Sequence, residues 1–328
     1  MNISNSFFYM LINKVISMNY HIAIRMRPVV VNYPFVIENL ELTNKCPMKC
    51  IMCVRTYKMT RPQGFMDAEI FKKIIDEIVQ INPPFIHKNG LWLHHFGESL
   101  LHPEFDKMIS YCSARGVKVG LSLNPIMLTE NIADRLIKAK PNLLYFAMDG
   151  HDDESFFKIR GIANAFNKSK ENILRFLKLK ENNKSKVRVV ISMIDFAENS
   201  HSMEEMHFFW KRQRGINEVF KKPFTDWNGD VEEITNMIES HKLPVKNKTK
   251  QNNTKPATCS TPWLKMSITW DGDVVPCCND YDKKYVLGNV NNNTLSEIWN
   301  GDKIKDLRRE LRANVVRNEL CRNCRSLG

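Results

Sequence analysis

Residues Glu41–Arg55 read ELTNKCPMKCIMCVR, and the interpretation of the whole chain starts from this stretch. It places Cys46, Cys50 and Cys53 in a C-x3-C-x2-C spacing, just after an apolar run that predicts a strand at Phe35–Leu42. Three cysteines this close can ligate one metal centre together. A [4Fe–4S] cluster normally takes four thiolates, so three would leave one iron open to an exogenous ligand. An open position is typical of a catalytic metal site, and a zinc knuckle with a distant fourth ligand is the alternative.

Length and composition favour a globular protein with one large domain and a small one. The chain has 328 residues, of which 43% are hydrophobic, and it contains no apolar run long enough to span a membrane. The first residues lack the basic region, continuous apolar core and cleavage site of a signal peptide, so we expect a cytoplasmic protein. The net charge of +12 is spread along the chain, which indicates a solvated basic surface rather than a nucleic-acid site.

Segments with strand and helix character alternate after the cysteine stretch. This alternation predicts a parallel sheet covered by helices, and periodicity alone allows either an open doubly wound sheet or a partial barrel. The further predicted strands are Leu91–Phe96, Val117–Leu123, Leu143–Met148, Val187–Ile194 and Glu218–Lys222. The predicted helices begin after Asp67, at Pro103 and after Thr129, and two more cover residues 166–177 and Met203–Arg212.

The C-terminal part follows a different pattern. Pro244–Thr258 is polar and predicts a linker, and residues 268–275 predict a hairpin with an Asp-Gly turn. Helices are expected at Thr294–Trp299 and at Asp302–Leu311, the second of them capped by Asp302. The expected division is an N-terminal extension (1–33), a core domain (34–230), a linker (231–256) and a cysteine-rich domain (257–328).

A second set of cysteines closes the chain. Four thiolates saturate a [4Fe–4S] cluster or a zinc ion equally well, and clustered cysteines in a cytosolic protein indicate metals rather than disulfides. Cys277 and Cys278 are adjacent, and strand alternation would turn their side chains to opposite faces, so only one of them is expected to bind the metal centre. We prefer Cys277 as the ligand because four residues separate it from Gly272. The predicted ligands of this set are Cys259, Cys277, Cys321 and Cys324.

These two cysteine sets resemble those of the radical S-adenosylmethionine (radical SAM) enzymes. The resemblance implies a partial (β/α)6 TIM-like barrel whose open iron is chelated by SAM, which is cleaved to a 5′-deoxyadenosyl radical. The segment from GDVVPCCND through LGNVNNNTLSEIWN to CRNC resembles the SPASM/twitch extension with its auxiliary [4Fe–4S] cluster. Because the chain ends four residues after Cys324, it resembles the shorter twitch form, similar to enzymes of the 2-deoxy-scyllo-inosamine dehydrogenase type.

The resemblance also implies SAM-binding residues. Gly97-Glu98 matches the centre of the family's Gly-Gly-Glu-Pro motif, in which the carboxylate holds the SAM amino group, with Phe96 and Ser99 in place of a Gly and the Pro. Of His94 and His95, one must point inward, more plausibly as a supporting side chain than as a ligand. The predicted SAM contacts are Met52, Gly97, Glu98, Ser122, Asn124 and Arg160.

A fully thiolate-bound auxiliary cluster is better suited to moving electrons than to binding substrate. This favours a net two-electron oxidation of a carbinol on a sugar or cyclitol, with peptide crosslinking or epimerisation as the alternative. The implied partners are a small-molecule or peptide substrate and an electron donor such as flavodoxin or ferredoxin. Rivals from other classes are a zinc-stabilised RNA-binding module and a plain two-cluster electron carrier.

Overall fold

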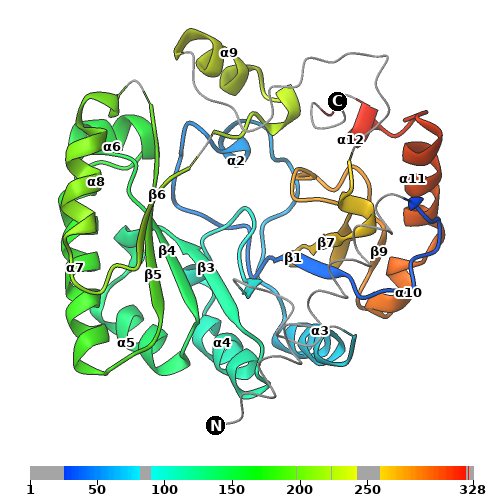
Figure 1. Cartoon of the computed structure of the whole chain (residues 1–328), viewed down its shortest axis with the longest axis horizontal. Helices are drawn as coiled ribbons and strands as arrows, with labels where there is room; N and C mark the ends of the chain where they lie inside the picture. Colours follow the sequence, from blue (N-terminus) through cyan, green and yellow to red (C-terminus); the bar gives the residue numbers. More distant parts are fainter. Residues whose placement is uncertain are drawn as a thin grey trace.

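The structure is a computed structural model that describes residues 26–81, 90–196, 198–222, 224–241, 259–322 and 324. Within these residues the chain forms one sheet with the strand order β6-β5-β4-β3-β2-β1-β7-β8-β9. The first six strands are β1 (Val36–Leu40), β2 (Leu91–Trp92), β3 (Val119–Leu123), β4 (Leu143–Ala147), β5 (Arg188–Ile194) and β6 (Glu218–Lys222). Figure 1 shows that this sheet curves around the centre of the molecule.

The strands β1 to β6 pair in parallel, each with its neighbour in sequence, as the alternating pattern predicts. Strand β2 is shorter than the predicted strand Leu91–Phe96. It ends at Trp92, because the chain leaves the sheet after the amide of Leu93 has donated to the carbonyl of Gly120 at 3.0 Å. In the described residues β1 pairs on its far side with β7 and β6 pairs with β5 alone, so the sheet is an open, partial barrel.

Helices cover the outer face of the parallel strands (Figure 1). The Asp67 carboxylate accepts hydrogen bonds from the amides of Glu69 and Ile70, which confirms the predicted cap of the first long helix. Three helices of this part were not predicted: α2, α6 and α9. The helices of this part are α2 (Val54–Tyr57), α3 (Ala68–Ile81), α4 (Phe105–Ala114), α5 (Glu130–Ala139), α6 (Asp153–Arg160), α7 (Phe166–Asn182), α8 (Met203–Lys211) and α9 (Glu232–His241).

The C-terminal part extends the same sheet. Strand β7 (Lys265–Ile268) lies parallel to β1 and forms the predicted hairpin with β8 (Asp273–Val275), and Gly272 adopts a φ of 86° in its turn. Helix α11 starts at Asp302 but has Gly301 as its cap, with no side-chain cap, so the predicted capping role of Asp302 is wrong. The other elements are β9 (Gly288–Asn289), α10 (Leu295–Trp299), α11 (Asp302–Ala313) and α12 (Glu319–Arg322).

Several contacts cross the expected domain boundaries. The end of the N-terminal extension packs on the C-terminal part, because Asn300 exchanges two hydrogen bonds with the backbone of Val31. The indole of Trp263 donates to the carbonyl of Pro28 at 2.8 Å. Helix α9 occupies the start of the segment expected to be a linker, and the polar run Pro244–Thr258 lies outside the described residues.

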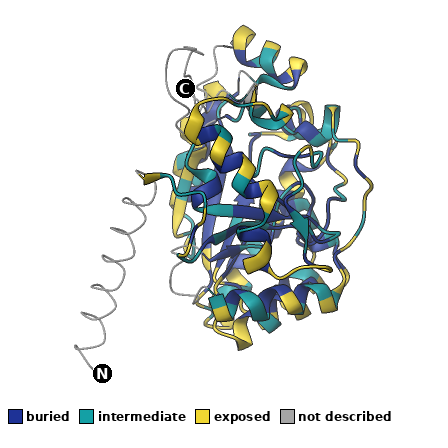
Figure 2. Ribbon diagram, turned by 90° about the vertical axis from the view of Figure 1, so that its right-hand side faces the viewer, coloured by how far each residue is buried: buried dark blue, intermediate teal, exposed yellow. Residues whose placement is uncertain are grey.

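Burial follows the layers of the fold. Figure 2 shows buried residues along the sheet and exposed residues on the outer sides of the helices. The face of α3 that carries Phe71, Ile74, Ile75 and Ile78 is buried, as is the Cys112 thiol on α4. No helix among the described residues is long and apolar enough to cross a membrane.

Candidate active site

A cavity of about 190 Å³ lies at the carboxyl ends of the parallel strands. Because parallel strands end at the same edge of a sheet, residues distant in sequence meet there. Every predicted SAM contact and every cysteine of the first set lines this cavity. These residues are Cys46, Cys50, Met52, Cys53, Gly97, Glu98, Ser122, Asn124 and Arg160.

The first cysteine loop is held in place by the end of helix α6. The amide of Lys49 donates to the carbonyl of Arg160 at 3.3 Å, and the amide of Ile51 donates to the carbonyl of Ile159 at 3.0 Å. The last carbonyls of a helix have no partner within it, so this docking satisfies them. Helix α6 therefore positions the loop that carries Cys50.

Burial disfavours the charged form of the cysteine thiols. It raises the pKa of Cys46 to about 12 and also raises the pKa of Cys53. Thiolates are the metal-binding form, so these side chains need a cationic centre to become ligands. In the described part of the chain no group of three or more His, Cys, Asp and Glu side chains is spaced to hold a single metal ion. Three thiols that line one open cavity fit an iron–sulfur cluster with an open coordination position.

Gly97 and Glu98 lie against the first cysteine loop. A Cβ on Gly97 would come within 1.9 Å of the Thr43 carbonyl oxygen, so this close backbone approach requires glycine. The amide of Glu98 donates to the carbonyl of Lys45 at 2.8 Å. Ser99, which replaces the Pro of the motif, donates its hydroxyl to the Leu93 carbonyl at 2.5 Å. The loop is thus held without proline.

The Glu98 carboxylate is buried, and its two oxygens accept hydrogen bonds from the amides of Asn124 at 2.8 Å and Leu100 at 3.3 Å. Burial outweighs these bonds and raises the pKa of Glu98 to about 7. The Asn124 side chain accepts from the Ile126 amide, while its own Nδ2 is buried without a partner. A ligand that brings an ammonium to Glu98 and an acceptor to Asn124 would satisfy both groups.

Arg160 lines the cavity and also has partners within the protein. Its guanidinium pairs with the buried carboxylate of Asp149, and Nη1 lies 3.6 Å from the Cys50 sulfur. The buried Nε of Arg160 has no partner. The other oxygen of the Asp149 carboxylate accepts from the Ile194 amide at 2.7 Å, which fixes the carboxylate.

Several cavity residues were not predicted. Ser192 lies two residues before the end of β5 and Lys222 ends β6, so their places near the carboxyl ends of strands could have indicated them. Trp227 has no such signal; it adopts a φ of 49°, and its indole donates to the Met52 carbonyl at 2.9 Å. His94 and His95 both line the cavity, although one was expected to point away. Burial lowers the pKa of His94 to about 3, so its ring is neutral.

The second cysteine set also gathers in space. Burial raises the pKa of Cys321 to about 12, with further contributions from Cys259 and Cys324 nearby. Burial likewise raises the pKa of Cys277, and the charges of Cys278 and Cys321 raise it further. All nine cysteines are free thiols. The four predicted ligands therefore lie within electrostatic reach of one another, and Cys278 acts on the same group.

Two family models match the chain. The model described as the radical SAM superfamily matches residues 40–209, more than half of the 328 residues. The model described as the iron-sulfur cluster-binding domain, SPASM, matches residues 259–325. The first match contains Cys46, Cys50 and Cys53, and the second contains the other predicted ligands.

Curated relatives differ in what they act on. The tungsten-containing aldehyde ferredoxin oxidoreductase cofactor-modifying protein of Pyrococcus furiosus is 25% identical over 299 residues, covering 80% of each chain. The PqqA peptide cyclase of Gluconobacter oxydans is 22% identical and covers 87% of this chain and 81% of that protein. The S-adenosyl-L-methionine-dependent 2-deoxy-scyllo-inosamine dehydrogenase of Niallia circulans is 32% identical over 71 residues, which cover 21% of this chain and 28% of that protein.

The fold is shared with solved structures. SuiB of Streptococcus suis, bound to the precursor peptide SuiA, aligns with a TM-score of 0.63 at 14% identity. The alignment covers 94% of this chain and 73% of that chain. It thus extends over the parallel sheet and the cysteine-rich part.

Proposed function

This chain belongs to the radical SAM superfamily, and on that premise we propose that Cys46, Cys50 and Cys53 hold the [4Fe–4S] cluster at which SAM is reductively cleaved. The observation that carries the proposal is the single cavity that these cysteines share with the predicted SAM contacts. When bound, the cluster supplies the electron with which a radical SAM enzyme generates its 5′-deoxyadenosyl radical.

The residues of the cavity have distinct proposed roles toward SAM. Glu98 accepts the ammonium group, which offsets the burial of its carboxylate. Asn124 donates through its unpartnered Nδ2, and Arg160 offers its unpartnered Nε to the SAM carboxylate. Met52 and Ser122 line the remaining wall, where an apolar side chain suits the adenine and a hydroxyl suits the ribose.

We further propose that Cys259, Cys277, Cys321 and Cys324 hold the auxiliary [4Fe–4S] cluster. Four thiolates leave no open iron, so this cluster is suited to accepting the second electron of a substrate oxidation. The proposed reaction is oxidation of a carbinol on a sugar or cyclitol, as the name of the dehydrogenase relative implies for that protein. Flavodoxin or ferredoxin is the proposed source of the first electron.

Peptide modification is the second candidate. The peptide cyclase relative covers more than four fifths of both chains, whereas the dehydrogenase relative covers 21% of this chain. Product analysis by mass spectrometry separates the two candidates, because a carbinol oxidation and an intramolecular peptide crosslink both remove two hydrogens, but from different substrates. A panel of aminocyclitols and of peptides encoded near the gene supplies the test compounds.

The experiment that tests the SAM chemistry is anaerobic reconstitution followed by iron and nucleoside analysis. We expect about eight irons per chain, for two four-iron clusters, and 5′-deoxyadenosine formation on addition of SAM and a strong reductant. A variant with Cys46, Cys50 and Cys53 all replaced by Ala should hold about four irons and form none. A well-loaded wild-type protein that leaves SAM intact with every candidate substrate would contradict the proposal, as would a colourless zinc protein.

A further inference from the structure

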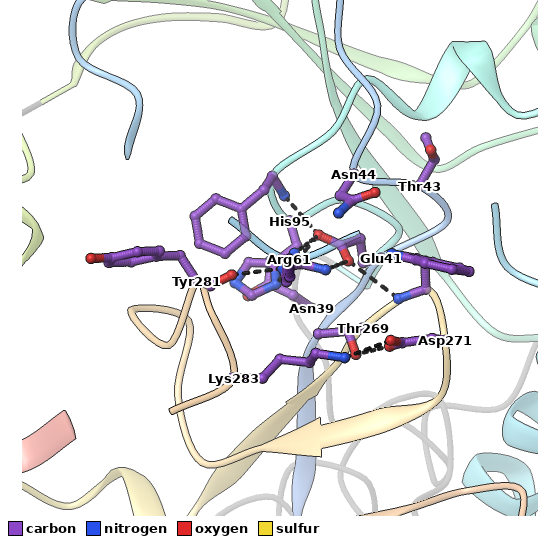
Figure 3. Close-up of polar contacts among 12 residues, drawn as sticks. Asn39, Glu41, Thr43, Asn44, Arg61, His95, Thr269, Asp271, Tyr281 and Lys283 are labelled. Carbon is purple, nitrogen blue, oxygen red and sulfur yellow. Dashed lines mark hydrogen bonds and ion pairs between the residues drawn. The ribbon is translucent and has the colours of Figure 1, made fainter. Parts of the chain in front are cut away.

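Glu41 and Arg61 form a buried ion pair for which the SAM chemistry has no use. Their side chains are 0% and 3% exposed. The guanidinium contacts both carboxylate oxygens, with Nη1–Oε2 at 2.7 Å and Nη2–Oε1 at 2.6 Å. Figure 3 shows the pair between the end of β1 and the hairpin of the C-terminal part. Neither residue lines the cavity.

The other hydrogen bonds of the pair reach both parts of the molecule. The Glu41 carboxylate accepts from the amide of Phe96 at 3.3 Å, next to Gly97 in the core, and from the amide of Trp270 at 3.2 Å, in the β7–β8 turn. Arg61 Nε donates to the carbonyl of Tyr281 at 2.6 Å. One ion pair therefore joins the loop of the proposed SAM motif to the turn and loop that flank Cys277.

Neighbouring contacts continue the same junction. The Asp282 carboxylate accepts from the amide and hydroxyl of Thr60 at 2.8 and 2.9 Å. His95 Nε2 lies 2.9 Å from the carbonyl oxygen of Cys278 and must donate to it, because a carbonyl oxygen can only accept. Since His95 also lines the cavity, the wall of the catalytic site contacts the backbone of the auxiliary cysteine loop directly.

Stability alone does not explain such a pair. A buried ion pair often contributes no more than well-packed apolar residues would, and its best-attested role is to specify one arrangement. Here the guanidinium satisfies Glu41 and Tyr281 at the same time through its rigid fork, which a lysine ammonium cannot reproduce. We propose that the Glu41–Arg61 pair is a positioning element that fixes the auxiliary-cluster loop against the catalytic cavity and thereby sets the relation between the two iron–sulfur sites.

This inference rests on the proposed function for the identity of the two clusters, and its test is independent of turnover. The variants are Arg61→Lys, which keeps the charge, and Glu41→Gln, which keeps one oxygen acceptor. The matched control is Lys283→Met. Lys283 pairs with Asp271 (Figure 3) and with Asp273 at the same hairpin turn, but all three residues belong to the C-terminal part.

The measurements are hydrogen exchange on the reconstituted holoenzyme and pulsed dipolar EPR between the reduced clusters. In both pair variants we expect exchange at residues 270 and 277–282 to accelerate by about tenfold or more, and the distance distribution to broaden. Lys283→Met should match the wild type at residues 277–282 and in the distance distribution. If Arg61→Lys fails to load iron, Glu41→Gln decides the comparison.

Wild-type exchange and an unchanged distance distribution in the pair variants would overturn the inference. Equal effects of Lys283→Met would overturn it as well, because the response would then not depend on the contact between the two parts. Failure of the wild-type protein to cleave SAM contradicts the proposed function and leaves the exchange comparison valid. The two failures are therefore distinguishable.

Discussion

At the scale of single residues, Glu98 shows how burial prepares a binding group. Two backbone amides favour its charged form, but desolvation dominates and raises its pKa to about 7. A bound ammonium would reverse this balance, because an opposite charge within contact distance stabilises the carboxylate. The site thus combines a strong driving force for cation binding with a carboxyl group that is easily protonated when SAM is absent.

The raised pKa of Glu98 predicts a pH dependence with a definite sign. Between its ordinary value of 4.5 and about 7, the folded protein retains a proton that the unfolded chain has lost. The stability of the SAM-free protein should therefore fall by up to about 3 kcal/mol as pH rises through this window. SAM affinity should rise over the same window, by up to about tenfold per pH unit, because binding requires the ionised form.

Denaturation midpoints and anaerobic calorimetry across this pH range measure both effects. The control is Glu98→Gln, which cannot ionise and should bind SAM weakly with little pH dependence. An affinity that is flat with pH in the wild type would show that Glu98 does not pair with the ammonium.

Gly97 carries a steric prediction. Its Cβ position lies 1.9 Å from the Thr43 carbonyl oxygen, so Gly97→Ala must displace the loop or the strand end. We expect a loss of stability of about 1–3 kcal/mol and a loss of SAM binding larger than this stability change explains. The control is Gly288→Ala, where the new methyl group meets the flexible side chain of Ile298 at 3.0 Å. Thermal melts and SAM titration of both variants make the comparison, and normal binding by Gly97→Ala would contradict the assigned motif.

At the scale of elements, helix α6 supports the first cysteine loop from a distance. Its N-terminus has a capping box in which Asp152 and Ser155 satisfy each other's backbone groups, and its C-terminus accepts the amides of Lys49 and Ile51. We expect Asp152→Ala to lower stability by about 1 kcal/mol and to accelerate amide exchange at those two residues. Thr294→Ala removes the comparable capping box of α10 and should cost similar stability without that acceleration. Equal amide exchange at Lys49 and Ile51 in both variants would contradict the coupling between the α6 cap and the first cysteine loop.

The sequence predicted long periodic elements well and short ones poorly. Helix α3 has the predicted Asp67 cap, and its apolar face of Phe71, Ile74, Ile75 and Ile78 is buried. Helix α6 was missed because its eight residues include the exposed Phe157, which obscures an apolar stripe. Helix α9 was missed because the polar run that follows it dominated the composition.

At the scale of the whole molecule, spacing predicted which residues meet but not how they pair. The cysteines, Gly97-Glu98 and the ends of β3 and α6 were brought to one cavity by parallel topology, which sequence order alone indicates. The pairing of Arg160 with Asp149 and the junction through Glu41 and Arg61 depend on loops whose paths no periodicity encodes. Contacts of this kind, between segments distant in sequence, can be identified only once the fold is known.

The separation of the two cysteine sets predicts separable functions. Replacing both Cys321 and Cys324 by Ala should reduce iron from about eight to about four per chain. SAM cleavage should persist, because the first set lies at the carboxyl ends of the parallel strands and shares no ligand with the second. Product formation should stop if the auxiliary cluster receives the second electron.

Two single variants serve as controls for the double variant at Cys321 and Cys324. Iron content, 5′-deoxyadenosine and product are measured on each. Cys112→Ala removes a fully buried core thiol and should lower stability with both clusters intact. Cys278→Ala should retain about eight irons if Cys277 is the ligand. Product formation by the Cys321 and Cys324 variant would show that the second electron leaves by another route, because that protein would lack the only acceptor that the proposal provides.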